Sequence, residues 1–142
     1  RCQRIVHNDG INWIDDSKAT NVGATLAAIN GFGKILQPSE RLILIAGGEG
    51  KGADFSTLKK VIAEHVSQLI TLGKDGNKIA VFSANTIEVD SLEEAVITAS
   101  RLAKVNDTVL LSPACASLDM FKNFAERGEV FTNAVKRLKV VK

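Results

Sequence analysis

Three short segments carry the residue types that could bind an anion. Residues 13–21 pack two adjacent carboxylates, Lys18 and Thr20 into one polar stretch. Residues 47–52 combine four glycines with a glutamate and a lysine, and residues 112–117 read Ser-Pro-Ala-Cys-Ala-Ser. Glycine-rich backbone N–H groups beside a lysine suit a phosphate or a carboxylate. Anion binding is therefore the chemistry that these segments favour.

The elements that must position these segments follow from the apolar pattern. Short apolar or β-branched runs predict strands, and helices are predicted between them. The predicted strands are residues 3–7, 11–14, 42–46, 69–72, 86–89 and 107–111. The predicted helices are residues 20–31, 56–66, 77–82, 91–102 and a C-terminal stretch from residue 118. In that stretch Asn123 followed by Glu126 resembles a capping box, which predicts a break with an unpaired Phe124 N–H.

Strands that alternate with helices predict an α/β fold, a doubly wound and mostly parallel six-stranded sheet of the Rossmann-like kind. The turn at residues 8–10 predicts a hairpin, which adds one antiparallel edge. Each polar segment follows a predicted strand. Ligands of such sheets bind beyond the carboxyl ends of the strands, so we expect the three segments to form one site.

Bulk properties restrict the class of protein. The 142 residues are 45% hydrophobic and 24% charged, which is typical of one globular domain. The net charge of +2 favours neither nucleic acid nor a membrane surface. Cys2 and Cys115 lie far apart and outside any metal-binding spacing, so we expect reduced thiols, a cytoplasmic location and no zinc. The chain begins at Arg1 rather than methionine, which predicts a fragment of a longer protein.

Each segment also has a plainer interpretation. The glycine segment is not a P-loop, because Ile45 and Gly52 stand where glycine and serine or threonine are required. It matches a dinucleotide-binding fingerprint, with Asp75 at a suitable distance, and it could equally be a tight turn. Thr20 could simply cap a helix, although a cation such as Lys18 is disfavoured at a helix start. Cys115 is expected to be a small buried residue.

The three segments together resemble the C-terminal domain of the bacterial Mur ligases. The resemblance covers the whole chain and rests on three motifs, Trp-Ile-Asp-Asp-Ser-Lys-Ala-Thr-Asn (13–21), Gly-Gly-x-Gly-Lys-x-Ala-Asp-Phe (47–55) and Ser-Pro-Ala-Cys-Ala-Ser-Leu-Asp-x-Phe-Lys-Asn-Phe (112–124). It is strongest to the members that add D-glutamate. An Asp-Asn-Pro-Arg-type motif of the diaminopimelate- and lysine-adding relatives is absent from the sequence.

The resemblance implies a single domain over residues 1–142, the amino-acid-binding domain of a three-domain cytoplasmic ligase of peptidoglycan synthesis. ATP would phosphorylate the carboxylate of UDP-N-acetylmuramoyl-L-alanine, and the amine of D-glutamate would then form the amide bond. The P-loop and the Mg²⁺ ligands would lie outside this chain. The chain alone would therefore be inactive.

The resemblance also assigns site residues. Lys51 and Thr20 would hold one carboxylate of D-glutamate, and Ser117 and the backbone N–H of Phe124 would hold the other. Residues that would face ATP are Arg1, near the phosphates, Asp16, near the ribose, and Lys18. No residue of the chain is assigned to the chemical step or to a metal.

Overall fold

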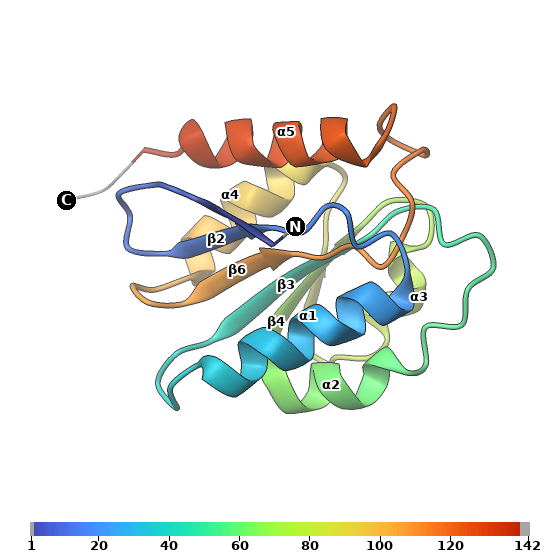
Figure 1. Cartoon of the computed structure of the whole chain (residues 1–142), viewed down its shortest axis with the longest axis horizontal. Helices are drawn as coiled ribbons and strands as arrows, with labels where there is room; N and C mark the ends of the chain where they lie inside the picture. The colour runs from blue at the N-terminus through green and yellow to red at the C-terminus, as the bar shows by residue number, and fades with distance from the viewer. Residues whose placement is uncertain (1, 140–142) are drawn as a thin grey trace.

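Strands and helices alternate along the chain to build one layered α/β structure (Figure 1). The computed structural model describes residues 2–139. The strands are β1 (Gln3–Ile5), β2 (Asn12–Asp15), β3 (Leu42–Gly47), β4 (Val66–Leu72), β5 (Thr86–Glu88) and β6 (Thr108–Leu111). The helices are α1 (Val22–Ile35), α2 (Leu58–His65), α3 (Gly76–Ala80), α4 (Leu92–Leu102) and α5 (Phe124–Lys136).

The sheet has six strands in the order β1-β2-β6-β3-β4-β5. Neighbouring strands are parallel except for β1 and β2, which form an antiparallel hairpin through a turn with Gly10 at φ +77°. The mostly parallel sheet with one antiparallel edge is therefore confirmed. Its order places β6 between β2 and β3, so the loops that follow these three strands leave the sheet side by side.

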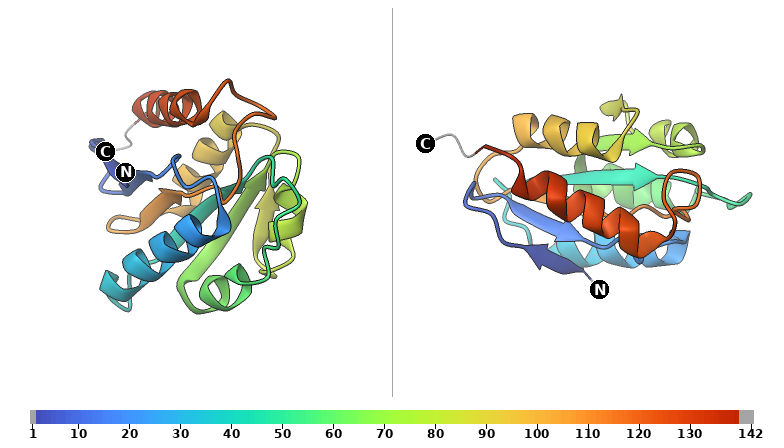
Figure 2. Two further views of the ribbon diagram at one scale, coloured as in Figure 1. Left: turned by 45° about the vertical axis from the view of Figure 1, so that its right-hand side comes forward. Right: turned by 90° about the horizontal axis from the view of Figure 1, so that it is seen from above.

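Helices cover both faces of the sheet, and each face has its own apolar core (Figure 2). Successive side chains of a strand point to opposite faces. Along β3, Leu42 and Leu44 therefore pack toward α1 and α2, while Ile43 and Ile45 pack toward α4 and α5. Trp13 and Phe131 meet edge to face in the second core, with ring centroids 6.2 Å apart. Both faces of β3 are buried, which explains why residues 42–46 form a continuous apolar run.

The predicted end of one helix and the predicted start of one strand were wrong. Helix α1 runs on to Ile35 instead of stopping near Gly31. A Cβ on Gly33 would lie 2.4 Å from the His65 ring, so Gly33 lets α1 approach the end of α2 and is not a stop signal. Strand β4 begins at Val66, before the predicted start. Its second and third residues, Ser67 and Gln68, are polar, so the apolar pattern did not include them in the strand.

The C-terminal helix begins at Phe124, so the predicted helical character of residues 118–122 was wrong and the predicted break was right. Asn123 is the N-cap, and its side chain accepts a hydrogen bond from the Glu126 N–H at 2.8 Å. The first helical N–H, that of Phe124, has no partner inside an α-helix and is oriented outward from its end. Among residues 2–139, no helix has the length and apolarity that a membrane span requires.

Candidate functional site

The loops after β2, β3 and β6 are joined to one another by backbone hydrogen bonds. The Ala114 N–H donates to the Ala19 carbonyl at 3.0 Å, which links the loop after β6 to the loop after β2. The Gly47 N–H donates to the Pro113 carbonyl at 3.0 Å, which links the end of β3 to the loop after β6. The prediction that the three polar segments meet at one edge of the sheet is confirmed.

The glycine loop, residues 47–52, is also paired with the loop after β6. Glu49 and Ala116 exchange two backbone hydrogen bonds, of 3.0 and 2.9 Å, as an isolated antiparallel bridge. Gly47 approaches β4 so closely that an added Cβ would lie 1.9 Å from the Leu72 carbonyl oxygen. This position tolerates no side chain, and its φ of +130° also requires glycine.

Lys51 stands at the tip of the glycine loop in a left-handed backbone conformation, with φ +52°. A residue with a Cβ adopts this region at a cost of about 1–2 kcal/mol, which glycine avoids. Lys51 is exposed, as are its neighbours in residues 52–54. A charged side chain is thus held at a backbone position that favours glycine, which points to a use for the ammonium group.

Asp16, the first residue after β2, anchors the loop that follows this strand. Its carboxylate is 1% exposed and accepts a hydrogen bond from the Ser112 hydroxyl at 2.9 Å, and its N–H donates to the Leu111 carbonyl at 2.8 Å. The Thr25 hydroxyl donates to the Ser112 carbonyl at 3.2 Å. Asp16 therefore ties β2 and β6 together where both strands end.

A buried arginine, Arg127, joins α5 to the same loops. It is 3% exposed, its Nε donates to the Ser17 hydroxyl at 2.9 Å, and its two terminal nitrogens donate to the carbonyls of Ser17 at 2.7 Å and Cys115 at 3.0 Å. Burial lowers the pKa of Arg127 to about 10, so the guanidinium stays charged at neutral pH. The sequence analysis missed this residue. The signal was its place four residues before Phe131, on the inward face of a helix.

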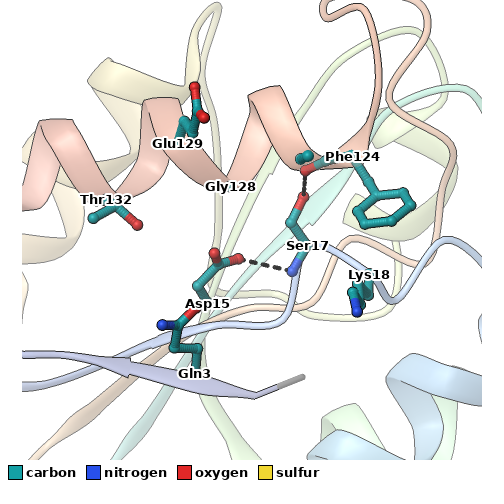
Figure 3. Close-up of a pocket in the computed structure, with 9 residues that line it drawn as sticks. Gln3, Asp15, Ser17, Lys18, Phe124, Gly128, Glu129 and Thr132 are labelled. Atoms are coloured by element: carbon teal, nitrogen blue, oxygen red, sulfur yellow. Dashed lines mark hydrogen bonds between the residues drawn. The ribbon is translucent and has the colours of Figure 1, made fainter.

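A cavity of about 310 Å³ lies between the loop after β2 and α5 (Figure 3). Lys18 and Phe124 stand on one side of it and Thr132 on the other. Its lining residues are Gln3, Asp15, Ser17, Lys18, Phe124, Ala125, Gly128, Glu129 and Thr132.

Hydrogen bonds fix two walls of this cavity (Figure 3). The Ser17 hydroxyl donates to the Phe124 carbonyl at 2.7 Å, and the Ser17 N–H donates to Asp15 Oδ1 at 2.9 Å. Burial raises the pKa of Asp15, although the bond from Ser17 opposes the shift. Side-chain and backbone groups of Asp15, Ser17 and Phe124 thus fix these walls, and Lys18 lies exposed at the rim.

The structure brings the predicted site residues to one edge of the sheet without joining all of them in one cavity. Lys18 and Phe124 line the cavity of Figure 3. Thr20 is half-buried on the loop after β2, Ser117 is 3% exposed on the loop after β6, and Lys51 is exposed on the glycine loop. Asp16 is buried as described above, and Arg1 lies outside the described residues. The ligand contacts assigned to them stay predictions.

Two alternative interpretations of single residues can be judged from the geometry. Burial raises the pKa of the Cys115 thiol to about 12, which suits the expected small buried residue and not a nucleophile. The Asp75 carboxylate accepts a hydrogen bond from the Gly50 N–H at 2.7 Å and is 7% exposed. It faces the glycine loop, whereas a dinucleotide-binding acid must face a ribose.

Comparison with known sequences identifies relatives over nearly the whole chain. The family described as "Mur ligase, glutamate ligase domain" matches residues 1–115. The UDP-N-acetylmuramoylalanine–D-glutamate ligase of Colwellia psychrerythraea is 60% identical over 96% of this chain and 29% of its own length. The enzyme of that name from Legionella pneumophila strain Lens is 50% identical over 97% of this chain and 31% of its own length. The chain thus spans about three tenths of these relatives.

Solved structures share the fold at lower identity. Escherichia coli FolC in complex with ADP superposes with a TM-score of 0.67 at 22% identity, over 94% of this chain and 31% of that one. The UDP-N-acetylmuramate-alanine ligase MurC of Thermotoga maritima gives 0.62 at 14% identity, over 94% of this chain and 29% of that one. At these identities the likeness shows the α/β fold.

Proposed function

Because the chain belongs to the Mur ligase family as a glutamate ligase domain, we propose that it is the D-glutamate-binding part of an ATP-dependent ligase. The full-length enzyme would add D-glutamate to UDP-N-acetylmuramoyl-L-alanine in the cytoplasmic stage of peptidoglycan synthesis. The relatives of 50–60% identity that carry this ligase name support the proposal. The observation that carries it is that the three loops carrying Thr20, Lys51 and Ser117 are hydrogen-bonded to one another at the carboxyl end of the sheet.

D-glutamate presents two carboxylates that must be held while its amine stays available. We assign one carboxylate to Lys51 and Thr20, which supply one cation and one hydroxyl. We assign the other to the Ser117 hydroxyl and the N–H of Phe124, the first residue of α5. A charge-assisted hydrogen bond fixes an anion more firmly than a neutral one, and the neutral donors add direction.

The contribution of this domain to the reaction is placement of the amine. ATP phosphorylates the carboxylate of UDP-N-acetylmuramoyl-L-alanine, the amine nitrogen attacks the acyl carbon, the new C–N bond forms and phosphate leaves. An amine held within about 3 Å of that carbon reacts as if at very high local concentration. The domain therefore needs binding groups and no nucleophile, which agrees with the inert Cys115.

On the ATP side we assign Arg1, Asp16 and Lys18. Lys18 is exposed at the rim of the cavity beside Ser17, where a phosphate could approach it. Asp16 is 1% exposed, so its contact with the ribose requires the residues that cover it to move. Within residues 2–139 no cluster of histidine, cysteine or acidic side chains fits a metal ion. By the family resemblance we place the Mg²⁺ ligands and the P-loop in the longer chain, and we expect this chain alone to have no ligase or ATPase activity.

Substitutions in the full-length enzyme test the assignment. Lys51→Ala and Ser117→Ala should each raise the KM for D-glutamate by the equivalent of about 2–3 kcal/mol, the size of a lost charge-assisted hydrogen bond. The KM for ATP should change far less. Lys60→Ala is the matched control, because Lys60 is an exposed lysine of α2. Equal effects on both substrates, measured by steady-state kinetics, would refute the assignment.

A further inference from the structure

We infer that Asp75 is a positioning residue for Lys51. Its carboxylate holds the Gly50 peptide so that the ammonium group of Lys51 projects from the tip of the glycine loop toward the bound carboxylate. The inference rests on the proposed role of Lys51 in D-glutamate binding, and it adds a residue that makes no contact with the substrate itself.

The first step is the conformation that has to be maintained. Lys51 has a φ of +52°, and the next residue, Gly52, has a φ of +75°. An L-residue avoids this left-handed region unless surrounding contacts impose it. The tip has room for movement, since a Cβ on Gly52 would meet no atom within 4 Å. The contacts that impose the conformation must therefore lie on the residues before and after the tip.

Those contacts converge on Gly50. Its N–H donates to Asp75 Oδ2 at 2.7 Å, and the Asp75 N–H donates back to the Gly48 carbonyl at 2.8 Å. The Ala53 N–H donates to the Gly50 carbonyl at 3.0 Å, which closes the turn after Lys51. Both ends of the turn thus depend on the orientation of the Gly50 residue, and Asp75 fixes that orientation.

Packing around Gly50 leaves no room for a side chain. A Cβ on Gly50 would lie 2.7 Å from the Phe55 ring and 3.2 Å from Asp75 Oδ2. The other carboxylate oxygen, Asp75 Oδ1, lies 3.1 Å from the Lys78 ammonium. The hydrogen bond from Gly50, followed by the one from Lys78, holds the pKa of Asp75 below its ordinary value. The carboxylate is therefore charged, buried and fully used, which suits a part that positions other groups.

Three substitutions in the full-length enzyme separate this role from others. Asp75→Ala removes the acceptor and should raise the KM for D-glutamate about tenfold, the scale of one lost hydrogen bond to a charged group. Asp75→Asn keeps an acceptor for the Gly50 N–H and should restore the KM to within about threefold of wild type. Lys78→Ala removes only an ion pair at an exposed lysine and should leave the KM within about twofold. The KM for ATP should stay within about twofold in all three.

The outcomes distinguish this inference from the proposed function. If Lys51→Ala raises the KM for D-glutamate and Asp75→Ala does not, Asp75 does not position Lys51. If Asp75→Ala lowers the melting temperature and kcat but leaves the KM unchanged, its role is merely structural and the inference is overturned. If Lys51→Ala itself leaves the KM for D-glutamate unchanged, the proposed role of Lys51 is refuted, and the inference about Asp75 is refuted with it.

A second measurement covers an Asp75→Ala protein that does not fold. In the wild-type enzyme the Gly50 amide should exchange its hydrogen slowly, because it is bonded to a buried carboxylate. In folded Asp75→Asn it should exchange faster, because the remaining acceptor is neutral. Exchange of the wild-type Gly50 amide as fast as that of the exposed Gly52 amide would overturn the inference.

Discussion

The two ends of the parallel sheet both carry a buried charged side chain, and they use it differently. At the amino ends of the strands, Asp107 is 2% exposed and accepts hydrogen bonds from the N–H groups of Arg41 at 2.9 Å and Lys104 at 2.8 Å. The Arg41 guanidinium adds a bond of 3.0 Å. At the carboxyl ends, Arg127 donates to Ser17 and Cys115 in the same self-contained manner.

The difference lies in what surrounds each buried charge. Around Asp107 the charged and polar groups satisfy one another, and the partner cation is Arg41 itself. Around Arg127 the hydrogen bonds fix the loop after β2, which carries the exposed Lys18, and the loop after β6. The loop after β6 is in turn paired with the glycine loop, which carries the exposed Lys51. We therefore expect the amino end to serve stability, whereas the carboxyl end also carries the proposed anion-binding groups. Two substitutions and one labelling experiment can break or sharpen this contrast.

The largest effect is expected from Arg127→Ala. It removes the donors that the buried carbonyls of Ser17 and Cys115 require, and it should lower the free energy of unfolding by about 3 kcal/mol. In the full-length enzyme it should also raise the KM for D-glutamate, because the loops it joins loosen. Urea denaturation followed by circular dichroism measures the first effect, with Arg101→Ala as the control, because Arg101 is an exposed residue of α4. An Arg127→Ala variant with unchanged free energy of unfolding and unchanged KM for D-glutamate would remove the contrast between the two ends.

Asp107→Ala should lower the free energy of unfolding by about 2 kcal/mol and leave the KM for D-glutamate unchanged. Burial alone would raise the pKa of Asp107, but the bonds from Lys104 and Arg41 hold it below its ordinary value of 3.8. Its contribution to stability is therefore present above that pH and is lost as the pH falls through the lower, folded pKa. Denaturation curves at pH 7 and pH 3 should show the gap between variant and wild type shrinking in acid. A changed KM would mean that the amino end also acts on the site.

The smallest effect concerns the two cysteines. Burial raises the pKa of Cys115 to about 12, whereas Cys2 is exposed. At pH 8 iodoacetamide should modify Cys2 and spare Cys115, as mass spectrometry of the peptides would show. A thiol with a raised pKa contributes stability that is present below its ordinary value of 9.0 and is lost as the pH rises through about 12. Rapid labelling of Cys115 would indicate that the loop after β6 opens.

The fold could be predicted from the sequence because its signals are local. The apolar run of residues 42–46 and the pattern Ser91-x-x-Glu94 at the start of α4 each lie within a few residues of the element they define. Ser91 is the N-cap of α4, and its hydroxyl accepts a hydrogen bond from the Glu94 N–H at 3.0 Å. The end of α1 was predicted wrongly because glycine at position 33 is required by the close approach of His65, which belongs to another helix.

The site could be predicted only in part, for the same reason. The three polar segments can be recognised from their composition, and the order of the strands brings them together. The bond between Ser17 and Arg127 spans 110 positions along the chain, and that between Gly50 and Asp75 spans 25. No periodicity connects residues at such separations. The contacts of the groups that support the loops could therefore not be predicted from the sequence, whereas the polar groups on the loops could.

The paired backbone bonds between Glu49 and Ala116 have a consequence for how fast a ligand can be captured. They fasten the glycine loop and the loop after β6 into a single stiff cradle before anything is bound. Little chain disorder then has to be lost on association, so the entropic cost falls mainly on the incoming molecule. We therefore expect the association rate to be set by diffusion and by electrostatic attraction to Lys18 and Lys51, without a slow rearrangement of the loops.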